Sequence, residues 1–250
     1  PLVFEDKVFL SIGGDRTTIV ALNKNTGETI WESKTLNDWA AYVTPTLISE
    51  NNKDIVLTVL ANNVLGVDAT TGDIIFNYDY AAIDNEESLK AWDGAPFTNT
   101  NIPVYHNKQI YVTSGYNHVG VKFQLSDDLQ NIEIAYIDTV LDVHHGGVVF
   151  LDGFIYGSNW INNGNGNWCC INFETGEKMW EQKWKCKGSI IANGNMLYLY
   201  DEKTGFIGLA KASPEKFEII SSFKVPLGKG PHWSHPVISN GILYIRHMDA

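Results

Sequence analysis

One hairpin phrase recurs three times in the sequence, and it constrains the fold more than any other feature. The copies are ALNKNTGETIW at Ala21–Trp31, GVDATTGDIIF at Gly66–Phe76 and CINFETGEKMW at Cys170–Trp180. Each copy has its glycine at the same place, at Gly27, Gly72 and Gly176. A glycine lets the backbone take a positive φ in a tight turn, and the apolar runs beside it are typical of paired strands. Three copies of one hairpin predict a repeat protein.

A second phrase recurs between these hairpins: an apolar run, a short polar turn and another apolar run. It occupies residues 1–12, 45–60, 102–115, 147–158, 189–200 and 235–246, so successive copies start 42–57 residues apart. Each unit therefore holds four short strands, two in this phrase and two around the Thr-Gly turn. Units of about 40–50 residues with four strands are typical of propeller blades. The runs are rich in β-branched and aromatic residues and show no sustained helical period. The predicted fold is an all-β propeller of four-stranded antiparallel blades.

The expected domain is a single β-propeller covering residues 1–250, with about five and a half blades. The blades are predicted at 1–37, 38–80, 99–140, 143–184 and 186–226, with a partial sixth at 233–250. The third and fifth blades lack the Thr-Gly phrase and have Ser126–Leu129 and Ala212–Lys216 in its place. Because an open set of blades would expose strand edges, we expect more blades before Pro1 and a closing strand after Ala250.

Four-stranded meanders determine which loops share one end of a propeller. The loops between blades and the loops joining the second and third strands lie together and form a funnel. The candidate ligand-binding residues of this funnel are Arg16, Trp39, Tyr42, Asp93, His144, His145, Trp160, Lys187, His232, Trp233, His235 and Arg246. Residues 81–98 form the one long insertion, and a docked surface loop is favoured over a cover for the site.

Composition excludes several functions. Lys and Arg total 18 against 29 Asp and Glu, a net charge of −11 that repels phosphate backbones, so nucleic acid is not an expected partner. No apolar stretch reaches about 18 residues, so no transmembrane segment is expected. The histidine pairs at 144–145 and 232/235 match no zinc-binding spacing, so no metal site is predicted. Cys169 and Cys170 fall within a strand, where neighbouring side chains point to opposite faces, which favours two buried thiols over a vicinal disulfide.

The pattern A/GxDxxTGxxxW resembles the tryptophan-docking phrase of the PQQ-type β-propeller repeat family. Asn23 and Asn172 replace the usual Asp, and Phe76 replaces one tryptophan. The resemblance implies that Trp31 and Trp180 pack on the Thr-Gly turn of a neighbouring blade in a structural role. The phrases SGY (114–116), HHGG (144–147), HPV (235–237) and LYIRH (243–247) are similar to those of exported eight-bladed bacterial propellers. The resemblance therefore implies eight blades and export to the periplasm or outer membrane.

The family contains PQQ-dependent alcohol dehydrogenases and shorter cofactor-free propellers of the BamB-like branch. The expected function is a non-catalytic binding or scaffold propeller of the bacterial cell envelope, with no cofactor and no catalytic residue. Its partner would be an envelope protein or a small-molecule or saccharide ligand. The alternative is a PQQ- and calcium-dependent alcohol or sugar dehydrogenase. In that case Trp233 or Trp160 would stack on the quinone, and Asp93 or Asp142 would act as base. The cations that would pair with the carboxylates of PQQ are Arg16, Lys185, Lys187 and Arg246. Compact repeats with one modest insertion favour the scaffold.

Overall fold

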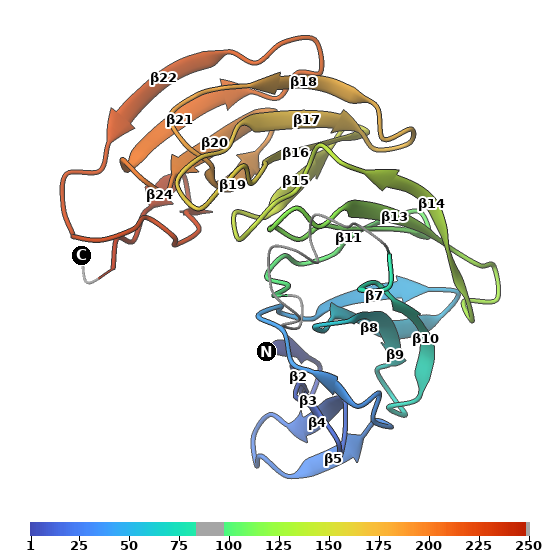
Figure 1. Ribbon diagram of the computed structural model, residues 1–250. Helices are drawn as coiled ribbons and strands as arrows, with labels where there is room; N and C mark the ends of the chain where they lie inside the picture. The colour runs from blue at the N-terminus through green and yellow to red at the C-terminus, as the bar shows by residue number, and fades with distance from the viewer. Residues whose placement is uncertain (84–97, 249–250) are drawn as a thin grey trace. The chain divides into compact units, whose positions relative to one another are not determined.

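The computed structural model describes residues 1–83 and 98–248, and these residues form strands, turns and loops. Antiparallel meanders follow one another along the chain, as the strand labels of Figure 1 show. Five sheets have four strands each, and β23 (Val237–Ser239) with β24 (Ile242–Tyr244) forms a two-stranded sixth. These sheets are the blades of an all-β propeller, so the predicted fold class is confirmed. No helix capable of crossing a membrane occurs among the described residues.

The chain divides into two compact units, which are described separately. The first unit comprises residues 1–112 and 121–135, and the second comprises residues 113–120 and 136–250. The first sheet contains β1 (Leu2–Phe4), β2 (Lys7–Ser11), β4 (Ile19–Asn23) and β5 (Thr29–Glu32). The second sheet contains β7 (Thr46–Glu50), β8 (Lys53–Val59), β9 (Asn63–Asp68) and β10 (Ile74–Asp79). The small strands β3 (Gly13–Gly14) and β6 (Asp38–Trp39) pair with each other.

The third sheet contains β11 (Val104–His106), β12 (Gln109–Val112), β13 (Gly120–Leu125) and β14 (Ile132–Asp138). The fourth sheet contains β15 (Val148–Leu151), β16 (Phe154–Ser158), β17 (Trp168–Asn172) and β18 (Lys178–Gln182). The fifth sheet contains β19 (Gly188–Asn193), β20 (Met196–Asp201), β21 (Phe206–Lys211) and β22 (Ile219–Lys224). The fourth and fifth sheets lie in the second unit.

The three Thr-Gly turns share one local structure. In each, the side-chain oxygen of Asn23, Asp68 or Asn172 accepts hydrogen bonds from the backbone N–H groups two and three residues later, at 2.8–3.1 Å. The glycines that follow have φ values of 75°, 83° and 74°. This Asx geometry explains why Asn substitutes for Asp in two copies, since both residues supply the same acceptor.

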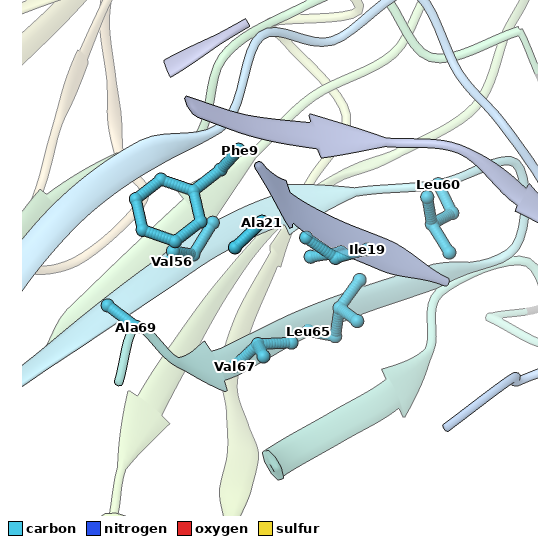
Figure 2. Close-up of a cluster of buried hydrophobic side chains, with 8 residues drawn as sticks. All are labelled: Phe9, Ile19, Ala21, Val56, Leu60, Leu65, Val67 and Ala69. Atoms are coloured by element: carbon cyan, nitrogen blue, oxygen red, sulfur yellow. The ribbon is translucent and has the colours of Figure 1, made fainter. Parts of the chain in front are cut away.

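Aromatic side chains join neighbouring blades within each unit. The Trp31 indole lies over the second-blade turn, and a Cβ added at Gly72 would stand 2.7 Å from its ring. Its Nε1–H donates to the Ala69 carbonyl at 3.3 Å. Figure 2 shows the buried cluster behind this contact, in which Phe9 and Ile19 of the first sheet meet Val56 and Leu65 of the second. The middle strands of the two sheets, β2 and β4 in the first and β8 and β9 in the second, therefore share one apolar core.

The second unit repeats this arrangement with a different ring in one position. Trp180 packs on Phe217 at 5.2 Å and donates from Nε1 to the Ser213 carbonyl at 2.8 Å. It therefore docks at the Ala212–Lys216 segment of the fifth blade and not on a Thr-Gly turn, so that part of the expectation for Trp180 is wrong. Tyr136 lies over the Thr-Gly turn of the fourth blade, 2.8 Å from a Cβ that Gly176 would carry, and its hydroxyl donates to the Phe173 carbonyl. A tyrosine thus fills the docking position that the sequence pattern assigns to tryptophan.

Candidate functional site

A cavity of about 270 Å³ lies in the second unit and brings several predicted residues together. Its lining consists of Tyr116, His144, His145, Asn163, Lys187, Glu202 and Trp233. Four of these residues precede the first strand of a blade, and the other three lie in loops that join a second strand to a third. The cavity is called the central pocket below.

Two glycines allow the backbone to approach closely beside the two histidines. A Cβ at Gly146 would stand 1.9 Å from the Gly188 carbonyl oxygen, and a Cβ at Gly188 would stand 1.8 Å from the Tyr200 carbonyl oxygen. In this close packing the Ile190 N–H donates to the Gly146 carbonyl at 3.1 Å, joining the fourth and fifth blades. Only glycine therefore fits at positions 146 and 188. The HHGG sequence allows the backbone next to His144 and His145 to lie directly against the fifth blade.

A fourth Asx–Thr-Gly turn holds Glu202. In the sequence DEKTG at residues 201–205, the Asp201 carboxylate accepts the N–H groups of Lys203 and Thr204 at 3.2 and 2.9 Å. This turn lies between β20 and β21 rather than between the last two strands of a blade. The Glu202 N–H donates to the Lys187 carbonyl, and the Glu202 carbonyl accepts the His232 N–H at 2.9 Å. The backbone of Glu202 is thus fixed on both sides.

The Glu202 carboxylate is the centre of a buried ion network. Its Oε1 atom accepts from Lys187 Nζ, and its Oε2 atom lies 2.9 Å from His145 Nε2. The side chains of Lys187 and Glu202 are only 4% and 6% exposed. Burial alone would raise the pKa of Glu202, but the hydrogen bonds from His145 and Lys187 outweigh burial and lower that pKa. The carboxylate is therefore ionised and already bound at neutral pH.

Aromatic rings continue from this network to the mouth of the pocket. The Tyr116 ring lies 4.5 Å from His144 and 5.2 Å from Trp160, and the His145 ring lies 5.5 Å from Trp233. Burial lowers the pKa of His144 to about 4, and the charge of Lys187 acts in the same direction. His144 is therefore a neutral aromatic ring at physiological pH.

Other predicted site residues of the second unit do not line the pocket. Trp160 contacts Tyr116 and donates from Nε1 to Asn163 Oδ1 at 3.0 Å. His235 Nε2 lies 3.1 Å from the His145 carbonyl oxygen and supports the His144–His145 loop. His232 Nδ1 lies within hydrogen-bond distance of the Tyr200 hydroxyl, at 2.6 Å, and the His232 ring stacks on His247. His232 therefore belongs to an aromatic cluster that is distinct from the pocket lining. Arg246 lines another, more open hollow with Lys229, Ser234 and Met248.

The remaining predicted residues belong to the first unit. Arg16 forms an exposed ion pair with Glu32 at 2.8 Å. Trp39 and Tyr42 are 68% and 81% exposed, on the segment between the first and second blades. Asp93, one of the two candidate bases of the dehydrogenase alternative, lies with most of the 81–98 insertion outside the described residues. The other candidate, Asp142, belongs to the second unit, where its Oδ2 atom accepts the Asn117 N–H at 2.8 Å and burial raises its pKa to about 8.

Sequence reasoning missed three residues of the central pocket. Tyr116, Asn163 and Glu202 all lie in loops joining second and third strands. A signal existed for Glu202, because DEKTG matches the N/D-x-x-T-G turn already identified in three places. Tyr116 has a φ of 68°, a conformation that sequence alone does not reveal for tyrosine.

The lining of the central pocket does not present the groups expected around PQQ and calcium. PQQ carries three carboxylates, whereas the one cation of the central pocket, Lys187, is neutralised by Glu202. Calcium needs several oxygen ligands, and no cluster of three or more His, Cys, Asp or Glu side chains fit for a metal occurs in the described parts of the chain. Cys169 and Cys170 are free, buried residues of β17, as their place within a strand predicts.

These features define a class: a β-propeller with PQQ-like repeats, whose blades dock through aromatic residues on Asx–Thr-Gly turns. The sequence matches the model of the family described as outer membrane protein assembly factor BamB over residues 1–152, more than half of its length. The chain belongs to this family. No match was found among curated protein sequences.

Solved structures show the same fold at low sequence identity. BamB from Moraxella catarrhalis is 18% identical with a TM-score of 0.71, covering 98% of this chain and 68% of its own. A europium-containing methanol dehydrogenase is 12% identical with a TM-score of 0.59, covering 89% of this chain and 50% of its own. The computationally designed Ika8 protein is 9% identical with a TM-score of 0.57, covering 97% of this chain and 65% of its own.

Proposed function

We propose that this protein is a non-catalytic binding or scaffold propeller of the bacterial cell envelope. The observation that carries the proposal is the state of the central pocket: its buried charges neutralise one another, while the Trp233 ring at its mouth is 57% exposed. A general base needs an available lone pair near its working pH. Glu202 is instead ionised and paired with Lys187 and His145, an arrangement that serves structure and binding.

Family membership supports the envelope location and a protein partner. The matching family is described as an outer membrane protein assembly factor, and BamB is the solved structure with the TM-score of 0.71. Exposed aromatic residues on loops are the side chains most enriched at protein interfaces. Trp233 in the second unit and Trp39 in the first unit are such side chains.

Site-directed photocrosslinking tests this proposal. The full-length protein would carry p-benzoylphenylalanine in place of Trp233 and would be irradiated with the envelope fraction of its source bacterium. The matched control carries the same residue in place of Thr175, which is exposed on the Thr-Gly turn of the fourth blade. We expect a discrete crosslinked protein from position 233 and none from position 175. Equal or absent crosslinking at both positions would contradict a partner-binding role for this surface.

A titration with PQQ and Ca²⁺, followed by tryptophan fluorescence, tests the dehydrogenase alternative. We expect no saturable quenching, because the pocket offers no free cation for the cofactor's carboxylates. Saturable quenching at micromolar or lower concentration would favour a quinoprotein and would call for an alcohol panel with an artificial electron acceptor.

A further inference from the structure

We propose that the central pocket binds one sugar residue of a neutral saccharide. This inference goes beyond the proposed scaffold function and does not depend on it, since a saccharide site can exist with or without a protein partner. It rests on the aromatic lining, the polar groups available for bonding, the charge balance and the size of the pocket.

The aromatic lining suits the apolar face of a pyranose. The C–H groups on one face of a sugar ring stack on aromatic side chains, whose ring faces carry partial negative charge. Trp233 is 57% exposed at the mouth, and Tyr116 lines the same pocket. Tyr116 is supported from behind by Trp160 at 5.2 Å, and Trp233 contacts His145 at 5.5 Å. Rings held in this way present surfaces for stacking with little further loss of conformational freedom.

Two polar side chains of the pocket have donors left over for hydroxyl groups. The Lys187 ammonium has three N–H donors, and Glu202 is the single acceptor that the described residues provide for it. Asn163 accepts from Trp160 through Oδ1, and its amide nitrogen has no acceptor among the described residues. Because Lys187 is only 4% exposed, its remaining donors need an acceptor in the pocket, such as a hydroxyl oxygen of a ligand.

Charge balance favours a neutral ligand. Lys187 and Glu202 form a pair with no net charge, and His144 is neutral because burial depresses its pKa. A phosphate or carboxylate would approach Glu202, and a cation would approach Lys187, so both kinds of ion would meet repulsion. Sugar hydroxyls both donate and accept, which matches a pocket that contains an ammonium, a carboxylate and an amide.

The size of the pocket limits the ligand to one ring at a time. Sites for drug-sized ligands run from about 300 to 1,000 Å³, and the central pocket, at about 270 Å³, lies just below that range. The exposed position of Trp233 leaves the mouth open, so a longer saccharide can extend into solvent from the bound residue.

Direct binding measurements test the proposal. The full-length protein would be titrated with glucose, galactose, mannose, N-acetylglucosamine, maltose and cellobiose. Saturation-transfer NMR detects the bound sugar, and tryptophan fluorescence gives the affinity. We expect at least one of these sugars to bind saturably at millimolar concentration or below, with tenfold or greater weakening in both Trp233→Ala and Asn163→Ala. Both side chains are exposed, so these variants should fold. Phe223→Ala, which removes a ring that is 51% exposed on β22 and does not line the pocket, should bind like the wild type.

Two outcomes would overturn the proposal. One is the absence of saturable binding by every sugar in the panel. The other is binding that Trp233→Ala and Asn163→Ala leave unchanged, because the sugar would then occupy a different surface. The crosslinking experiment above is read independently, so failure of the saccharide site and failure of the scaffold function remain distinguishable.

Discussion

Replacing Lys187 by methionine should destabilise the protein strongly, because it leaves the Glu202 carboxylate buried with one donor fewer. Both side chains are at most 6% exposed, so water cannot solvate the remaining charge. Breaking a buried ion pair on one side typically costs about 3–5 kcal/mol. His145 Nε2, at 2.9 Å, still supports the carboxylate and places the expected loss near the lower end of that range, at about 3 kcal/mol.

A double-mutant cycle separates this effect from lost packing. Lys187→Met, Glu202→Gln and the double variant would be compared by urea denaturation at pH 7. We expect each single change to cost about 3 kcal/mol and the double change to cost much less than the sum, since the second substitution removes the unpaired charge left by the first. If each single variant lost less than about 1 kcal/mol of unfolding free energy, and the double variant lost the sum of the two, the buried network would be refuted.

The pH dependence gives the cycle a second readout. The folded pKa of Glu202 lies below its unfolded value, so its contribution to stability is present above the unfolded pKa and is lost as pH falls through the folded pKa. Protonation also neutralises the carboxylate left unpaired in Lys187→Met. The stability difference between wild type and Lys187→Met should therefore narrow as the pH is lowered toward 4, and a constant difference would contradict the electrostatic explanation.

Three further predictions concern the supporting structure. Trp31→Ala and Trp180→Ala should each lower the free energy of unfolding by about 3–5 kcal/mol without reducing ligand affinity per folded molecule, as measured by denaturation and titration. Asp142→Asn should stabilise the protein by up to about 4 kcal/mol at pH 7 and by about 2 kcal/mol at pH 5, because burial raises the pKa of Asp142 to about 8. Equal thermal shifts at the two pH values would contradict this explanation. Gly188→Ala should cost about 3 kcal/mol or more, whereas Gly164→Ala, whose added Cβ meets nothing within 3.5 Å, should cost little in the same assay.

The fold was predictable because its main signal is local and repeated. The Asx residue, the Thr-Gly pair and the aromatic residue that follows are close in sequence, and each copy forms the same turn in the structure. The spacing of the copies then requires four strands per unit, which leads directly to a propeller. Tyr136 shows where the local signal ends, since its docking role depends on a glycine 40 positions later, on another blade.

The central pocket was only partly predictable for the same reason. His144, His145, Lys187 and Trp233 precede the first strands of their blades, so topology alone places them at one end of the fold. Glu202 is different, because nothing in its neighbourhood indicates that Lys187 and His145 will neutralise it. Burial and pairing of that kind depend on the close approach at Gly146 and Gly188, which is a tertiary property.

The Asx–Thr-Gly turn serves two purposes in this propeller. Between the third and fourth strands, its glycine receives an aromatic side chain that joins neighbouring blades, as Tyr136 does at Gly176. At residues 201–205 the same turn joins the second and third strands of the fifth blade. The His232 ring packs on its glycine, Gly205, where an added Cβ would stand 2.3 Å from the ring. The second residue of the turn is then Glu202, whose carboxylate enters the central pocket. A turn that packs blades together elsewhere thus positions a buried charge here, which explains how an element of the regular repeat contributes to a specific site.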